Sequence, residues 1–224
     1  MIHAILFDLD GTIIDSELVA FKAILDCYDQ WGVKINKADA SSVAGKKWEV
    51  AFRLLFQKYV MPLSEEQASQ MILKRYKERM QKEISVVEGV LEAIRYFAEE
   101  EKLKLALVSG SMRDDILWAL AKLNVMDHFQ IILGAEDYPQ SKPAPDGYEK
   151  AMGILQVNPE NCLVFEDSLA GIASGKAAGA KVVAITSTNH FQQNLSAADY
   201  AMKDFSSVDK KWFQELQKDL FKKF

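Results

Sequence analysis

The sequence contains few of the residues from which disulfide frameworks and histidine metal sites are built. Only two of its 224 residues are cysteines, Cys27 and Cys162, and both lie in apolar surroundings, so we expect buried thiols. The three histidines, His3, His128 and His190, are scattered along the chain, which argues against a histidine cluster that binds a metal or acts in catalysis. The chemistry of this protein therefore has to come from other side chains.

Long apolar runs and an excess of positive charge are also missing. No run approaches the ~20 residues that a membrane-spanning helix needs, and neither a basic stretch nor a cleavage signal precedes the first strand-like segment. The net charge is −5, from 27 basic and 32 acidic residues, which excludes a general attraction to nucleic acid or to anionic membranes. We expect a cytoplasmic protein, monomeric by default, with neither a nucleic-acid nor a membrane partner.

Short apolar runs alternate with longer segments of helical periodicity along most of the chain. Near-continuous apolar strands are buried on both faces, so this alternation predicts an α/β fold with a doubly wound, Rossmann-like parallel sheet. The predicted strands are Ile2–Phe7, Leu103–Val108, Gln130–Leu133, Cys162–Phe165 and Lys181–Ile185. The predicted helices are Val90–Glu101, Arg113–Leu123, Gly147–Leu155, Ala170–Ala178 and a surface helix packed on the core within Lys210–Phe224. Trp118, on an apolar helix face, is expected in the core.

Residues 16–85 interrupt this alternation, because they contain helical periodicity but no good strand candidate. The segment is much longer than the ~10–15 helical residues that usually connect parallel strands. We interpret it as a helical insertion beside the sheet, with Val86–Gly89 as the return linker. The predicted domains are therefore an α/β core, residues 1–15 and 86–224, and a helical domain, residues 16–85.

Acidic residues follow two of the predicted strands at the point where each strand ends. Asp8 and Asp10 come after the first strand, and Glu166 and Asp167 come after the fourth. Ligands of open α/β sheets bind outside the carboxyl ends of the strands, and like charges this close need a cation between them. One acidic pair could simply cap a turn, but two pairs at one edge of the sheet favour a cation site, and carboxylate oxygens suit Mg²⁺.

Residues that could bind a phosphate occur at two other places in the sequence. Ser109 and Gly110 end the second strand and lead into a helix, whose first N–H groups favour anions. Lys142 lies between Ser141 and Pro143, where a loop can hold it against a phosphate. With these groups present, one carboxylate can attack phosphorus, and another can protonate the leaving oxygen and later activate water. The expected partner is a small phosphorylated metabolite.

Four segments resemble the motifs of the haloacid dehalogenase (HAD) superfamily and occur in that family's order. They are Asp8-Leu9-Asp10-Gly11-Thr12, Ser109-Gly110-Ser111, Lys142 and Glu166-Asp167. The run from Phe165 to Gly179 is similar to the subfamily with a small helical cap inserted after the first motif. That subfamily includes sugar-phosphate and phosphoglycolate phosphatases and β-phosphoglucomutase, so the resemblance implies a HAD core with an inserted helical cap domain.

The resemblance also implies a role for each motif residue. Asp8 would be the nucleophile and Asp10 the general acid and base. Mg²⁺ would be bound by Asp8, the backbone carbonyl of Asp10 and Asp167, with Glu166 in support. An aspartate at position 10 favours phosphoryl transfer over dehalogenation, because a dehalogenase expels a halide and needs no acid there. The phosphoryl group would be held by Ser109, Gly110 and Lys142.

The cap is expected to contact the leaving group of the substrate. The alternative is that its lysines are ordinary surface cations and that its tryptophan serves packing. The candidate contacts are Glu17, Gly45, Lys46, Lys47 and Trp48.

A phosphosugar mutase of the β-phosphoglucomutase type is the main alternative to a phosphatase. That branch has a histidine shortly after the first motif and an arginine just after the cap glycine, whereas Ala20 and Trp48 stand at the comparable positions here. These departures favour a phosphatase that hydrolyses a small phosphate monoester, of the sugar-phosphate or phosphoglycolate type, through an aspartyl-phosphate intermediate. A non-catalytic metal-binding scaffold is a further alternative, against which stands the presence of a suitable residue at every catalytic position.

Overall fold

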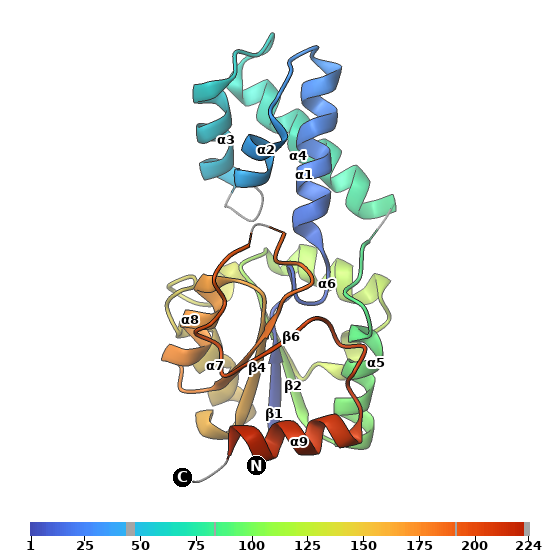
Figure 1. The fold of residues 1–224 in the computed structure, drawn as a ribbon, viewed down its shortest axis with the longest axis vertical. Helices are drawn as coiled ribbons and strands as arrows, with labels where there is room; N and C mark the ends of the chain where they lie inside the picture. The colour runs from blue at the N-terminus through green and yellow to red at the C-terminus, as the bar shows by residue number, and fades with distance from the viewer. Residues whose placement is uncertain (44–47, 83, 191, 222–224) are drawn as a thin grey trace. The chain divides into compact units, whose positions relative to one another are not determined.

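The computed structural model describes residues 1–43, 48–82, 84–190 and 192–221. The chain divides into two compact units, one formed by Met1–Ile14 with Val86–Phe224 and the other by Asp15–Ser85 (Figure 1). We call the first the core unit and the second the helical unit. Each has a hydrophobic interior of its own.

The core unit is built on a parallel six-stranded sheet with the strand order β3-β2-β1-β4-β5-β6. The first strand in the sequence is central, because Ala4 pairs with Lys104 on one side and with Cys162 on the other. This arrangement confirms the predicted α/β fold with a doubly wound parallel sheet. The strands are β1 Ala4–Phe7, β2 Lys104–Val108, β3 Ile131–Leu133, β4 Cys162–Glu166, β5 Lys181–Ile185 and β6 Tyr200–Met202.

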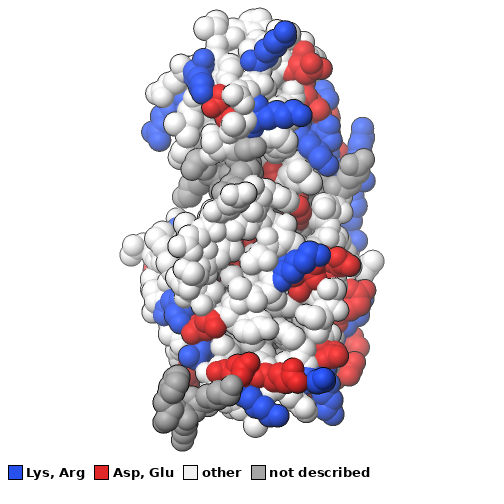
Figure 2. Space-filling view, in the orientation of Figure 1, with Lys and Arg blue, Asp and Glu red and all other residues white. Residues whose placement is uncertain are grey.

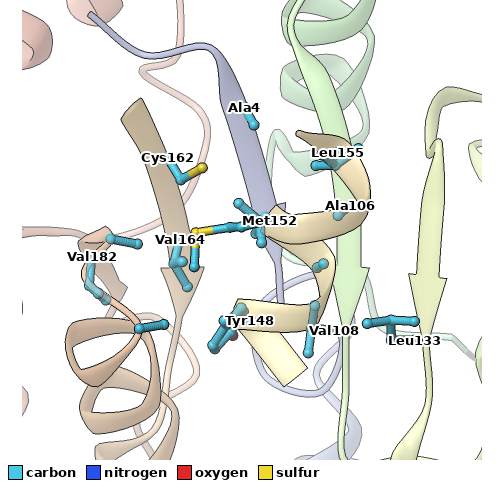
Figure 3. Packing of buried hydrophobic residues seen from close by; sticks show 14 of the residues in the cluster. Ala4, Ala106, Val108, Leu133, Tyr148, Met152, Leu155, Cys162, Val164 and Val182 are labelled. Atoms are coloured by element: carbon cyan, nitrogen blue, oxygen red, sulfur yellow. The ribbon is translucent and has the colours of Figure 1, made fainter. Parts of the chain in front are cut away.

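One face of the sheet is covered by α7 (Asp146–Leu155) and α8 (Leu169–Ala177). Side chains alternate between the two faces of a strand, so alternate residues of β1 to β5 pack under these helices. Figure 3 shows Tyr148 and Met152 of α7 among them. The strand residues in this cluster include Ala4, Leu6, Ala106, Val108, Cys162, Val164 and Val182.

The opposite face has an aromatic interior. Phe7 of β1 and Phe165 of β4 stack with ring centroids 5.2 Å apart. The ring of Phe97 lies 6.0 Å from Phe165 and 5.3 Å from Phe213. Phe97 belongs to a π-helical turn, and Phe213 belongs to α9, so the C-terminal helix packs on the core as predicted. The helical segments not yet given are α5 Val90–Arg95, the π turn Tyr96–Glu100, α6 Arg113–Lys122, α9 Lys210–Leu220 and three short 3₁₀ turns at Met126–His128, Ala135–Asp137 and Pro159–Asn161.

One expectation about the core unit was wrong, and two of its features were not predicted. Trp118 is 37% exposed and lies under the ammonium of Lys122, 5.2 Å from its ring centroid, because a ring on α6 can remain at the surface beside a cation. The helix predicted over Val90–Glu101 is confirmed, but its second part, Tyr96–Glu100, is π-helical. The strand β6 was not predicted, because it is a short edge strand in which only Met202 is buried.

The helical unit consists, in its described residues, of helices without a strand, as the periodicity predicts. Asp15 caps the first of them, since its carboxylate accepts a hydrogen bond from the N–H of Leu18 at 3.2 Å. The interior includes Ile24, Tyr28, Leu55 and Ile72, and Cys27 is a buried free thiol, like Cys162 of the core unit, as predicted. The helices are α1 Ser16–Gln30, α2 Lys37–Val43, α3 Trp48–Lys58 and α4 Glu65–Lys82.

Acidic and basic side chains are interspersed on the face shown in Figure 2. Among the described helices, none combines the length and the apolar character needed to cross a membrane. The buried charged side chains of the described chain lie in the core unit, at the carboxyl ends of its strands.

Candidate active site

The parallel register brings the two predicted acidic pairs together. Phe7 pairs with Phe165, and the N–H of Asp8 donates to the carbonyl of Phe165 at 3.1 Å, so Asp8 lies beside Glu166 at the end of the adjacent strand. Carboxylate oxygens of Asp8, Glu166 and Asp167 all lie within 4.8 Å of one another, and all three residues are buried. The clustering is a direct result of the strand order, since β1 and β4 are neighbours.

Lys142 supplies a positive charge to this cluster. Its Nζ donates to Asp8 Oδ1 at 2.5 Å, to Glu166 Oε1 at 2.6 Å and to the carbonyl of Val108 at 3.1 Å. An ammonium has three donors, so each of them has an acceptor. Although burial acts to lower it, the two carboxylates raise the pKa of Lys142 well above its usual value, and the side chain is charged at neutral pH.

Glu166 is held by partners on every side. The hydroxyl of Tyr148 donates to its Oε1 at 2.8 Å, and the ring of Tyr148 also lies under the Lys142 ammonium, 5.0 Å from Nζ. The other oxygen, Oε2, accepts from the N–H of Asp167 at 3.2 Å and from the hydroxyl of Ser168 at 3.1 Å. Glu166 therefore orients Lys142 toward Asp8.

Two glycines make room for the acidic side chains. Gly11 has φ of +85°, and a Cβ on it would lie 1.9 Å from Asp167 Oδ2. A Cβ on Gly171 would lie 1.8 Å from the carboxyl carbon of Glu166. The positive φ and the close approach both require glycine at position 11, whereas position 171 requires it for space alone.

Asp10 lies on the other side of the first motif, in the turn that follows β1. Its Oδ2 accepts hydrogen bonds from the hydroxyls of Ser111 at 2.6 Å and Ser109 at 3.3 Å. Its side chain is thus separate from the group formed by Asp8, Glu166 and Asp167, and it is partly exposed. Two serine hydroxyls therefore hold the Asp10 carboxyl group in a place that solvent can reach.

The loop after β2 is attached to the segment that follows β3. The N–H of Ser109 donates to the carbonyl of Leu133 at 3.0 Å, and the N–H of Ala135 donates to the carbonyl of Ser111 at 2.9 Å. The hydroxyl of Tyr138 donates to the carbonyl of Ser109 at 2.7 Å. Burial raises the pKa of Tyr138, so this hydroxyl is a proton donor at neutral pH.

The sequence analysis missed several side chains that support the site. Tyr148 could have been noticed, because it is an aromatic residue shortly after Lys142 in the same loop-to-helix segment. Tyr138 and Thr188 have no such signal, although the hydroxyl of Thr188 donates to the carbonyl of Gly11 at 2.6 Å. Both act on backbone carbonyls far away in the sequence, and such contacts leave no pattern in the chain.

The candidate cap residues are only partly described. Trp48 begins α3, and its ring lies 5.3 Å from Phe52 and 5.3 Å from Tyr76, so it packs within the helical unit. Glu17 lies in the first turn of α1. The other candidates lie outside the described residues: Gly45, Lys46 and Lys47.

The acidic cluster fits a divalent cation by its donor atoms. Three carboxylates and one ammonium lie together in a buried place, and the hard oxygen donors of the carboxylates suit a divalent cation.

The family of the chain follows from comparison with known proteins. Residues 5–185 match the haloacid dehalogenase-like hydrolases, and the chain belongs to this family. Validoxylamine A 7′-phosphate phosphatase from Streptomyces hygroscopicus subsp. limoneus is 29% identical over 208 residues, which cover 93% of this chain and 96% of that protein. Hexitol phosphatase B from Escherichia coli (strain K12) is 28% identical over 187 residues, 82% of this chain and 83% of that protein.

One of the similar solved structures is that of a mutase. The crystal structure of β-phosphoglucomutase from Clostridium difficile is similar with a TM-score of 0.73 at 25% identity, and the alignment covers 96% of each chain. The predicted membership of the HAD superfamily is thereby confirmed, together with the prediction of an enzyme of the hydrolase type.

Proposed function

We propose that this protein is a Mg²⁺-dependent phosphatase that hydrolyses a small phosphate monoester, of the sugar-phosphate or phosphoglycolate type, through an aspartyl-phosphate intermediate on Asp8. The observation that carries the proposal is the position of Asp8. It is a buried carboxylate at the end of the central strand, held by a charged lysine and adjacent to two further carboxylates. The similarity to proteins named as phosphatases supports the same reaction.

In the first step, an oxygen of Asp8 attacks phosphorus and the bond from phosphorus to the leaving oxygen breaks. Asp10 gives its proton to that oxygen, so the alcohol leaves neutral. The hydroxyls of Ser109 and Ser111 hold Asp10 in place for this transfer. Lys142 keeps the Asp8 carboxylate oriented, and Ser109, Gly110 and Lys142 bind the oxygens of the phosphoryl group.

In the second step, Asp10 accepts a proton from water while the water oxygen attacks phosphorus. The bond between phosphorus and Asp8 then breaks, and inorganic phosphate leaves with Asp8 restored as a carboxylate. Asp10 thereby regains the proton that it gave to the leaving oxygen.

Asp8 and Asp167 would hold Mg²⁺ together with the backbone carbonyl of Asp10, and Glu166 would support them. When bound, the ion supplies positive charge that neutralises the phosphate. Glu166 is almost entirely buried and already bonded to Lys142 and Tyr148, which suits support of the site better than a direct contact.

A mutase remains the second candidate, because the chain is similar to a β-phosphoglucomutase over nearly its whole length. Ala20 and Trp48 stand where the mutase branch has histidine and arginine, and Trp48 packs on Phe52. These residues favour water over a sugar hydroxyl as the second acceptor.

We further propose that the cap contacts the leaving group of the substrate through Glu17, Gly45, Lys46 and Lys47.

The test is a panel of phosphorylated metabolites with Mg²⁺, in which released phosphate and isomerised product are measured separately. We expect phosphate release that stops with a chelator and is absent in Asp8→Asn. Asp26→Asn is the matched control, because Asp26 pairs with Arg79 on the helical unit, and it should keep its activity. An active Asp8→Asn protein would overturn the mechanism, and isomerisation of a hexose 1-phosphate without phosphate release would replace phosphatase by mutase.

A further inference from the structure

The peptide between Ser109 and Gly110 has one polar group that is bonded and one that is not. Its carbonyl accepts the hydroxyl of Tyr138 at 2.7 Å. Its N–H, on Gly110, has no hydrogen-bond partner among the described residues, and Gly110 is exposed. The peptide is trans, and in a planar trans peptide the N–H points opposite to the carbonyl. Whatever fixes the direction of the carbonyl therefore fixes the direction of the N–H.

We propose that Tyr138 is a positioning residue, whose hydroxyl fixes this peptide so that the Gly110 N–H is held ready to donate to a phosphoryl oxygen. The inference rests on the proposed phosphatase function. It assigns to Tyr138 an effect on phosphate binding that it exerts through another residue, without contact with the substrate.

The fold itself makes no use of the missing side chain at position 110. A Cβ on Gly110 would have no atom within 4 Å, and its φ is not in the left-handed region. Neither packing nor backbone conformation therefore requires glycine. A glycine also lets a ligand approach the backbone closely, and that is the remaining physical reason for glycine at this exposed position beside Ser109.

Because residue 110 is glycine, the peptide before it needs a hydrogen bond from another part of the chain to keep its direction. Glycine has more backbone freedom than any other residue, so the peptide plane before it can rotate easily. The peptides on either side are fixed by two other bonds, from the Ser109 N–H to the carbonyl of Leu133 and from the Ser111 N–H to the Ser109 hydroxyl. Within the described chain, the carbonyl of Ser109 has Tyr138 as its donor.

Tyr138 is itself rigidly placed. It is 6% exposed, and its ring lies against the backbone of Gly147 in α7, where a Cβ would approach Tyr138 Cε1 and Cζ to 3.1 Å. Burial and packing against α7 therefore restrict the positions open to the hydroxyl. A fixed hydroxyl on a fixed ring is what a flexible glycine peptide needs in order to keep its direction.

The test is Tyr138→Phe, which removes the hydroxyl and keeps the ring. Tyr96→Phe is the matched control, because the hydroxyl of Tyr96 donates to Glu101 at 2.5 Å in the same unit but outside the site. Hydrolysis of p-nitrophenyl phosphate with Mg²⁺, inhibition by inorganic phosphate and thermal melting are measured for both. For Tyr138→Phe we expect KM and the inhibition constant of phosphate to rise about threefold to tenfold, the effect of one misdirected hydrogen bond, while Tyr96→Phe leaves both unchanged.

An unchanged inhibition constant in a folded Tyr138→Phe protein would overturn the inference, as would an equal rise in Tyr96→Phe. A second measurement needs no variant: titration of the wild-type protein with phosphate should shift the amide resonance of Gly110, and an unmoved resonance contradicts the proposal. The proposed function is tested separately: activity that persists in Asp8→Asn would contradict the mechanism, whereas the phosphate inhibition constant and the Gly110 resonance test the role of Tyr138.

Discussion

The core unit and the helical unit place their polar side chains in opposite ways. The buried polar and charged residues of the described chain belong to the core unit, apart from Ser16, and they include Asp8, Glu166 and Asp167. The helical unit has its charges at the surface, as in the pair of Asp26 and Arg79, whose side chains are 29% and 31% exposed. Burying charges is costly, so their concentration in one unit marks the place where function outweighs stability.

The largest expected effect on stability comes from removing the buried positive charge of Lys142. Lys142→Met leaves the carboxylates of Asp8 and Glu166 facing each other without a positive charge, and we expect unfolding free energy to fall by about 3–5 kcal/mol in a chelator, with loss of activity. Arg79→Met in the helical unit should cost no more than about 1 kcal/mol, because its partner Asp26 is partly exposed and also pairs with Arg75. Urea unfolding of the two variants checks this, and equal losses would contradict the contrast between the units.

The next effect comes from two glycines with positive φ. Gly11→Ala places a Cβ 1.9 Å from Asp167, whereas Gly32→Ala in the helical unit, at φ of +69°, meets no atom within 4 Å. Both variants incur the backbone cost of about 1–2 kcal/mol. Displacement of Asp167 should in addition lower kcat/KM of Gly11→Ala about a hundredfold. Steady-state kinetics at a temperature where both variants are folded measures this difference. An equal loss of kcat/KM in Gly32→Ala would contradict the role given to the contact with Asp167.

A smaller effect, dependent on pH, is expected at Asp199. Although burial acts to raise it, hydrogen bonds from Lys176 and from the N–H of Val182 hold the pKa of Asp199 below its usual value. A lowered folded pKa means that the stabilisation is complete above the unfolded pKa and disappears as pH falls through the folded one. Asp199→Asn should therefore cost about 1–3 kcal/mol at pH 7, and the difference from wild type should shrink toward pH 3.

The counterpart of Asp199 in the helical unit is Asp39, whose pKa is lowered by hydrogen bonds from Lys58 and Tyr59 at the surface. Asp39→Asn should change the unfolding curve less than Asp199→Asn at every pH. Chemical unfolding at several pH values measures both. A pH-independent loss in Asp199→Asn would show that packing, and not the charge, is responsible.

The smallest effect concerns hydroxyls that have no partner. Thr12 Oγ1 in the core unit and the Tyr28 hydroxyl in the helical unit are buried without a hydrogen bond in the described structure. Thr12→Val and Tyr28→Phe remove an unsatisfied group and keep the shape, so we expect stability to stay equal or to rise by about 1 kcal/mol. Thermal melting checks this, and a loss of stability in either variant would show that its hydroxyl is bonded in solution.

The sequence predicts those features of the molecule that depend on local pattern. The apolar runs around Leu6, Ala106 and Val164 predict the parallel sheet, because burial on both faces leaves no polar positions in a strand. The rule that ligands bind at the carboxyl ends of strands then predicts that Asp8 and Glu166 meet, and the structure brings them together.

What the sequence does not predict depends on distant contacts. Trp118 shows an apolar helical pattern but lies at the surface beside Lys122. Met202 lies in a strand too short to show a period. Tyr138 holds a carbonyl that precedes it by many residues, and only the folded chain brings the two together.

The central position of β1 determines when the active site can form in a growing chain. β1 is synthesised first, but its partners β2 and β4 come much later, whereas residues 15–85 form an uninterrupted unit that is complete early. At a ribosomal rate of about 5–20 residues per second, roughly 8–30 s pass between Asp8 and Glu166. During that time β1 is an apolar strand with both edges open to other chains. Until β4 emerges, Asp8 therefore lacks Glu166 and Asp167 beside it, and β1 stays open to pairing with other chains.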